Sequence, residues 1–151
     1  MSLIPFALGV MVVFGFLAAP LRAHMFRKLA SRATGDVYFS VSNRRGFALA
    51  LARATGPRAL AMTGSPCAVA DTTGIAFWDN NPFEYVTTIE WSRVSSVGFD
   101  DSQASTILLS LASGAQLPLL RPNGSNRFIA PRGETAWLVS QLRLLHAASV
   151  S

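Results

Sequence analysis

Two hydrophobic patterns divide the chain, and the first is an unbroken apolar run. Residues 3–21 read LIPFALGVMVVFGFLAAPL, nineteen positions without a charged side chain. As a helix rising about 1.5 Å per residue, the run spans roughly 28 Å, close to the hydrocarbon core of a bilayer at about 30 Å. The pattern predicts a transmembrane helix. A cleaved signal peptide is the alternative, because APLRA ends the run with small residues, but no Lys or Arg precedes the run.

Past Gly35 the chain shows the alternation of apolar and polar residues that is typical of strands. DVYFSVS at 36–42 predicts a strand. The stretch NRRGFALALARATGPR at 43–58 instead predicts a short helix near the membrane surface, capped by Asn43 and stopped by Gly56. The apolar face of this helix consists of Phe47, Ala50, Leu51 and Ala54.

Several later segments also read as strands. They are ALAMT (59–63), CAVAD (67–71), IAFWD (75–79), TTIEWSRVSSVGF (87–99), STILLSLA (105–112) and AQLPLLRP (115–122). The last two flank a hairpin turn at Ser113-Gly114, and Pro118 predicts that the second of them is an edge strand or is bulged.

The segment 87–99 has a further feature, a change in the phase of its alternation. Residues expected in the core are Ile89, Trp91 and Val97, and residues expected outside are Glu90 and Arg93. The phase changes between Trp91 and Val94, which predicts a bulge or a strand end near Ser92.

The chain closes with a helical pattern. ETAWLVSQLRLLH at 134–146 places Leu138, Leu142 and Leu145 on one face, which predicts an amphipathic helix of about three turns. Glu134 in the first turn and Arg143 with His146 in the last would suit the helix dipole.

Three of these stretches resemble the pleckstrin-homology-like (PH-like) architecture of bacterial membrane proteins. They are VADTTGIAFWD at 69–79, YVTTIEWSRVSSVGF at 85–99 and TAWLVSQLRLL at 135–145. In the second, Ile89, Val94 and Val97 match a pattern I-x-x-x-x-V-x-x-V. The order of transmembrane helix, basic stretch, strands and helix also resembles a small actinobacterial family of membrane-anchored proteins.

The resemblance implies a mainly β fold with helices, in two parts. Residues 1–30 would form the transmembrane helix and its basic juxtamembrane extension. Residues 35–148 would form a PH-like antiparallel β-sandwich or partly open barrel, closed by the C-terminal amphipathic helix. The resemblance implies a binding module without catalytic residues or cofactor. It does not imply phosphoinositide recognition, because CAVADTTGIAFWD contains no basic residue.

The formal net charge of +5 is unevenly distributed. Eight basic residues and one acidic residue lie between Arg22 and Arg58, so this third carries about +7, and the remaining charges sum to about −2. Basic residues immediately after the apolar run predict that the N-terminus faces out and that the rest of the chain is cytoplasmic. Two roles are open for these basic residues. They either set the topology only, or they also contact anionic lipid. No nucleic-acid motif surrounds them.

Catalytic chemistry has few candidate residues. The single cysteine, Cys67, fits a reducing compartment and is expected to pack as a small hydrophobe. His24 and His146 are expected to be solvated or interfacial. A hydrolase or transferase that uses Cys67 or the Asp100–Asp101 pair is therefore the least favoured class of function, and no metal site is predicted.

Two sets of residues are candidates for binding. Four aromatic residues around DNNP exceed what alternation can bury and form a candidate partner surface: Phe77, Trp78, Phe83 and Tyr85. Candidates for binding anions or lipid headgroups are Arg22, Arg27, Lys28, Arg121, Arg127 and Arg132. The sequence thus favours a single-pass cell-membrane scaffold or accessory subunit that binds a protein partner, with a lipid-surface sensor as the alternative.

Overall fold

A computed structural model gives the fold of the chain. It describes residues 28–29, 31–33, 35–41, 46–62, 66–80, 83–100, 103–120 and 132–151. The chain splits into two compact units, Met1–Thr34 and Gly35–Ser151. Within the residues so described, no helix combines the length and apolar character needed to cross a bilayer. The predicted span at 3–21 lies outside them.

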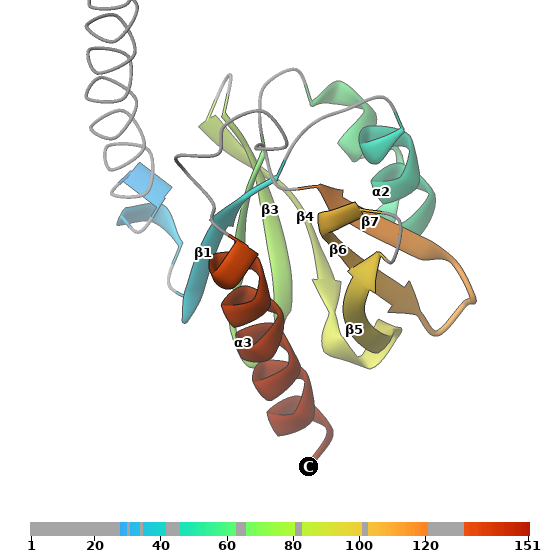
Figure 1. Cartoon of the computed structure of the whole chain (residues 1–151). Helices are drawn as coiled ribbons and strands as arrows, with labels where there is room; N and C mark the ends of the chain where they lie inside the picture. Colours follow the sequence, from blue (N-terminus) through green and yellow to red (C-terminus); the bar gives the residue numbers. More distant parts are fainter. Residues whose placement is uncertain are drawn as a thin grey trace, which may run out of the picture. The chain divides into compact units, whose positions relative to one another are not determined.

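The second unit, Gly35–Ser151, contains two antiparallel sheets and a C-terminal helix (Figure 1). Strands β1 (Val37–Ser40), β2 (Cys67–Ala70), β3 (Gly74–Asn80) and β4 (Phe83–Glu90) pair in that order. Strands β5 (Val94–Asp100), β6 (Gln103–Leu111) and β7 (Gln116–Leu120) form the second sheet. The helical elements are α2 (Phe47–Thr55), the 3₁₀ turns η1 (Pro57–Ala61) and η2 (Trp91–Arg93), and α3 (Arg132–Val150).

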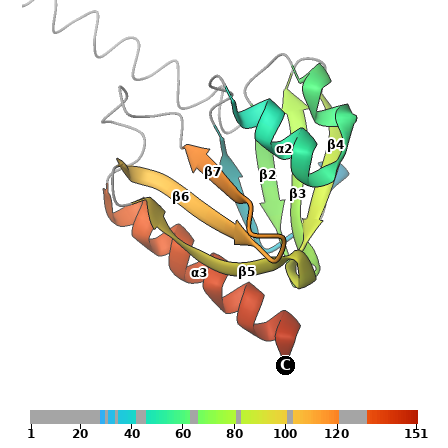
Figure 2. The same ribbon diagram turned by 90° about the vertical axis from the view of Figure 1, so that its right-hand side faces the viewer.

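The two long helices lie on opposite sides of the sheets. Helix α3 packs against β5, β6, η2 and β1, whereas α2 packs against β7 and β4. Figure 2 shows α3 running along β5 and β6, and α2 in front of strands β2, β3 and β4. The core between them is aliphatic and aromatic, and its largest fully buried side chains in this unit are Trp91, Phe39, Phe77, Leu51, Ile75, Ile89, Ile107, Leu109, Leu117, Leu119 and Leu142.

Several predicted elements are confirmed. The strand at 36–42 is β1, with Val37 and Phe39 in the core. The hairpin at Ser113-Gly114 joins β6 to β7, and Gly114 adopts a φ of 88°. Pro118 lies on β7, which is an edge strand, so its missing N–H interrupts no central ladder.

The helix predicted at 43–58 is also present, but its start differs from the prediction. Helix α2 begins at Phe47, and its N-cap is Gly46 rather than Asn43, which lies outside the described residues. Gly46 has a φ of 97°, a conformation that glycine adopts without steric strain. Phe47 and Leu51 are buried, as the apolar face predicted, and Gly56 ends the helix.

The strand predicted at ALAMT is wrong, because residues 57–61 form the 3₁₀ turn η1. Pro57 at the first position presets the backbone for a helical turn. The three-residue repeat of such a turn directs Ala59 and Met62 into the core, whereas Leu60 stays 56% exposed.

The segment 87–99 is not one strand. It contains the end of β4, the turn η2 and then β5, and the two strands belong to different sheets. The predicted strand end near Ser92 is therefore confirmed. Ile89, Trp91 and Val97 are buried, as predicted.

The C-terminal helix is longer than predicted. Helix α3 has nineteen residues, so Arg143 and His146 do not lie in its last turn. The helix continues because Ala147 and Ala148 favour helical backbone. Arg143 Nε instead donates to Val97 O at 2.8 Å, and His146 Nε2 hydrogen-bonds Val94 O at 2.8 Å, so both side chains tie α3 to β5.

A tight turn and a buried tryptophan join the two sheets. Asp71 Oδ1 accepts hydrogen bonds from the N–H groups of Thr73 (2.7 Å) and Gly74 (3.2 Å), which closes the β2–β3 turn. Trp91 then attaches to this turn, because its Nε1–H donates to Asp71 O at 2.6 Å and its backbone N–H to Thr73 O at 3.1 Å. This contact requires close approach at Gly74, where a Cβ would lie 2.2 Å from Ile89 O.

We predict that Gly74→Ala lowers the free energy of unfolding by about 3 kcal/mol or more, because backbone must move to make room for a methyl group. Gly98→Ala is the matched control: a Cβ there meets only Arg143 at 3.9 Å, so its effect should stay within about 0.5 kcal/mol. Urea unfolding of the full chain in mild detergent, followed by tryptophan fluorescence, measures both. Equal stability of the two variants would contradict this account of the junction.

Candidate functional site: an aromatic cluster on the four-stranded sheet

Strand register determines which side chains lie on the outer face of the four-stranded sheet. Side chains alternate between the two faces of a strand, so Tyr38, between buried Val37 and Phe39, points away from the core. Antiparallel pairing aligns Tyr38 with Val69, Ala76 and Thr88. In the next row of side chains on the same face, the pairing aligns Cys67 with Trp78 and Tyr85. The outer face is therefore largely apolar, and two of its residues, Cys67 and Val69, are buried.

The tip of the β3–β4 hairpin carries a three-residue cluster on this face, which we call the aromatic cluster: Trp78, Phe83 and Tyr85. The rings of Trp78 and Phe83 stack with centroids 5.5 Å apart and planes 24° apart. The ring of Tyr85 meets Trp78 edge-on at 5.7 Å. Tyr85 is 41% exposed, and its hydroxyl is 2.8 Å from Thr88 Oγ1.

Phe77, the fourth predicted partner residue, does not join this cluster. Its side chain is fully buried, and its ring lies 5.9 Å from that of Phe47 in the core. A register shift between Phe77 and Trp78 separates the two neighbours and sets Trp78 opposite Tyr85. Composition predicted that some of the four aromatics would be core residues, but only the register decides which.

The indole nitrogen of Trp78 is buried and has no hydrogen-bond acceptor in the described part of the chain. A buried donor without an acceptor costs about 1–3 kcal/mol. The aromatic cluster therefore contains a group whose placement does not serve the stability of the isolated chain.

Cys67 lies beside this cluster, is buried and forms no disulfide. Burial, and secondly the negative charge of Asp79, raise the pKa of the Cys67 thiol from its ordinary 9.0 to about 11. The thiol is therefore protonated at neutral pH, whereas nucleophilic attack requires a thiolate. Among the residues that the structure describes, no group of three or more His, Cys, Asp or Glu could hold a metal ion.

His146 lies in a different setting, half-buried on α3 with its ring 5.6 Å from the ring of Trp91. A carbonyl oxygen can only accept, so His146 Nε2 carries the proton donated to Val94 O. The predicted Asp100–Asp101 pair is described only in part: Asp100 ends β5, and Asp101 lies outside the described residues.

The basic residues predicted to bind anions lie mostly outside the described chain. Four of them are not described: Arg22, Arg27, Arg121 and Arg127. Arg132 begins α3, but its side chain is not described, and Lys28 is exposed in the first unit.

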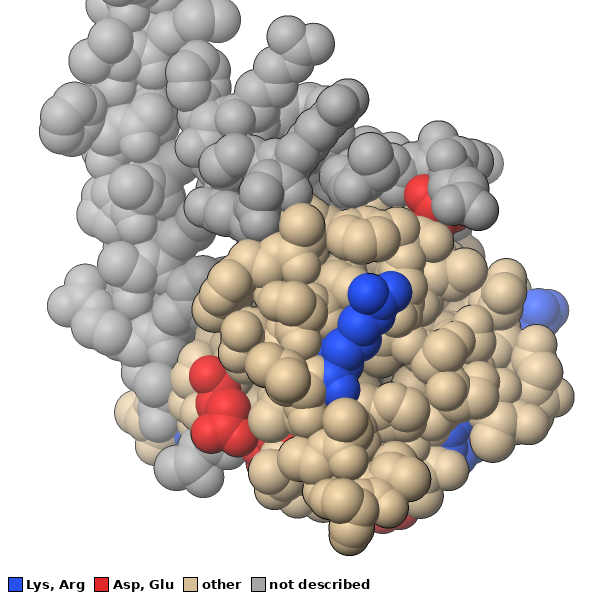
Figure 3. Space-filling view, turned by 60° about the horizontal axis from the view of Figure 1, so that its bottom comes forward, with Lys and Arg blue, Asp and Glu red and all other residues tan. Residues whose placement is uncertain are grey.

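Sequence patterns did not predict a second feature, an open hollow of about 820 Å³ at the end of the domain near His146. The β2–β3 turn, η2, the β6–β7 turn and the end of α3 line it, mainly with hydroxyl and small apolar groups and with Glu90. Figure 3 shows the domain from the end where α3 finishes, and few charged side chains lie on this face. These segments are far apart in the chain, so no local pattern indicates the hollow.

Two comparisons with known proteins were negative. No protein-family model matches the chain, and no curated protein matches it significantly.

We predict that Cys67 resists alkylation by iodoacetamide in the folded chain at pH 7–8, because the thiol is buried and its pKa is raised to about 11. Deprotonation is favoured only as the pH approaches that pKa, so the rate of labelling should rise steeply above pH 9. Mass spectrometry of the labelled chain measures the rate, and the urea-unfolded chain is the control. Labelling of the folded chain at pH 7 as fast as the unfolded chain would contradict the burial of this thiol.

Proposed function

We propose that this protein is a non-catalytic, single-pass membrane protein whose folded domain binds a protein partner as a scaffold or accessory subunit. The apolar run 3–21 and the basic residues after it support an N-terminus outside and a cytoplasmic domain. The order of four strands, three strands and a C-terminal helix supports a PH-like architecture for the domain.

The observation that carries the proposal is the aromatic cluster on the outer face of the four-stranded sheet. The ring of Trp78 contacts those of Phe83 and Tyr85, and the cluster exposes Tyr85 at 41%, beside half-buried Trp78 and buried Phe83. Aromatic residues are enriched at protein interfaces because they bury large area with few rotatable bonds. The unsatisfied indole of Trp78 is consistent with a cluster kept for binding rather than stability.

Charge around the aromatic cluster favours a protein over an anionic lipid surface. Strands β1 to β4 contain no Lys or Arg, and the hairpin that carries the cluster contains Asp79 and Glu84. Glu84 is exposed, but strand alternation directs it to the face opposite Tyr85, so what disfavours an anionic headgroup is the lack of a cation on these strands that could hold it. The partner should therefore present an apolar patch.

We predict that a photo-crosslinker placed by Tyr85→p-benzoylphenylalanine in the full chain captures one stoichiometric protein in intact membranes. The matched control places the same group by Phe99→p-benzoylphenylalanine, because Phe99 is an aromatic strand residue of equal exposure, 40% against 41%, on the other sheet. Electrophoresis and mass spectrometry identify the adducts. The same adducts from both positions, or only lipid adducts at position 85, would contradict partner binding at the aromatic cluster, and lipid adducts would favour the lipid-surface sensor.

We also predict that Tyr85→Ala abolishes co-purification of that captured protein while Phe99→Ala does not. Loss of the ring contact with Trp78 and the hydroxyl contact with Thr88 should lower the stability of the domain by about 1–2 kcal/mol. Urea unfolding checks that the variant remains folded. Full retention of the protein by folded Tyr85→Ala would show that the cluster does not bind it.

A further inference from the structure

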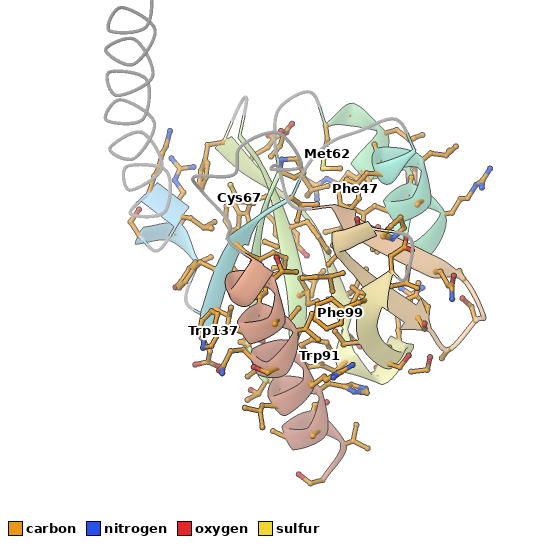
Figure 4. All side chains as sticks on the ribbon, in the orientation of Figure 1. Phe47, Met62, Cys67, Trp91, Phe99 and Trp137 are labelled. Carbon is orange, nitrogen blue, oxygen red and sulfur yellow. The ribbon has the colours of Figure 1, made fainter. Side chains whose placement is uncertain are left out.

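Helix α3 has apolar side chains on two opposite faces. One face packs into the domain through Leu138, Val139 and Leu142, which are buried. The other face leaves Trp137 58% exposed and Leu144 64% exposed. In Figure 4 Trp137 projects from α3 on the side away from β5. An amphipathic helix that only covered a core would carry polar residues there.

Small residues surround these two large side chains. At 100° per residue, the outward face consists of Ala136, Trp137, Ser140, Arg143, Leu144, Ala147 and Ala148. All of these residues are exposed. Arg143 is the one charged residue among them, and its Nε donates to Val97 O of its own domain. Nothing on this face therefore repels an apolar helix.

The order of large and small residues makes the outward face complementary to itself. Suppose that two copies of α3 cross antiparallel, with the two-fold axis at the level of residue 142 along the helix. Residue n of one copy then lies level with residue 284 − n of the other. Trp137 then meets Ala147 and Ala148, and Leu144 meets Ser140. Each large side chain faces small ones, as ridge-into-groove packing of helices requires. A two-fold axis makes both contacts twice.

We propose that the outward face of α3 is the interface of a homodimer in which two copies of the helix pack antiparallel. The interface lies on a different element from the aromatic cluster and does not depend on partner binding. The face runs about 18 Å from Ala136 to Ala148 at about 1.5 Å per residue, and is one helix wide. Two such faces bury less than about 1,200 Å², the size of weak, reversible interfaces.

Sedimentation of the full chain in density-matched detergent tests the proposal. We expect a reversible monomer–dimer equilibrium that Trp137→Lys weakens at least tenfold. Leu60→Lys is the matched control, because Leu60 is 56% exposed on η1 and should leave the equilibrium unchanged. A monomer at all concentrations up to about 100 μM, where a contact of this size should be populated, would overturn the proposal.

A second pair of variants separates specific packing from general stickiness. Ala147→Phe adds apolar area to the outward face but removes the space opposite Trp137, so it should weaken the dimer at least tenfold. Ala61→Phe makes the same change at an exposed position of η1 and should have no effect. A dimer that strengthens with Ala147→Phe, or that persists with both Trp137→Lys and Ala147→Phe, would place the contact elsewhere, for example in the apolar run 3–21.

Discussion

The anchorage of Trp91 to the β2–β3 turn is the constraint on which the rest of the domain depends. Trp91 begins the turn between the two sheets, is almost fully buried, and donates two hydrogen bonds to the backbone of the turn that Asp71 closes. The ring of His146 packs against the same indole, so the C-terminal helix meets both sheets there. Since these contacts need close backbone approach, only glycine fits at position 74. The buried side chain of Trp91 thus fixes the end of β4 in one sheet and the start of β5 in the other next to the β2–β3 turn.

This arrangement leaves two apolar surfaces that the core does not use. The inner face of the four-stranded sheet and one face of α3 close the core. The outer face of the sheet carries the aromatic cluster, and the outward face of α3 carries Trp137 and Leu144. The two surfaces lie on different elements, so a partner on the sheet and a second copy on α3 could bind the same molecule together. Under the two proposals, the dimer would bring two copies of one partner side by side.

The arrangement also bears on the chemistry of the chain. Cys67 is the residue best suited by type to covalent chemistry, and the sheet buries it beside Asp79, where the raised pKa of the thiol keeps it protonated. His146 is held by Val94 O and Trp91 at the junction of the sheets. In the described part of the chain, Cys67 and His146 are thus both held by contacts within the domain.

Elements with strong local signals are readable from the residues alone. They are β1, α2 with its stop at Gly56, the β6–β7 hairpin, the edge position of Pro118 and the strand end near Ser92. The sequence also singled out the aromatic residues around DNNP. Local patterns failed where a competing turn was stronger, as at Pro57, and they cannot reveal which strands pair. Three features follow from long-range packing instead. Residues 87–99 join two sheets, the register buries Phe77 and turns Trp78 to the other face, and Arg143 and His146 bind carbonyls of β5. The physical reason is that pairing and burial depend on residues far apart in the chain, whereas alternation and capping depend on neighbours.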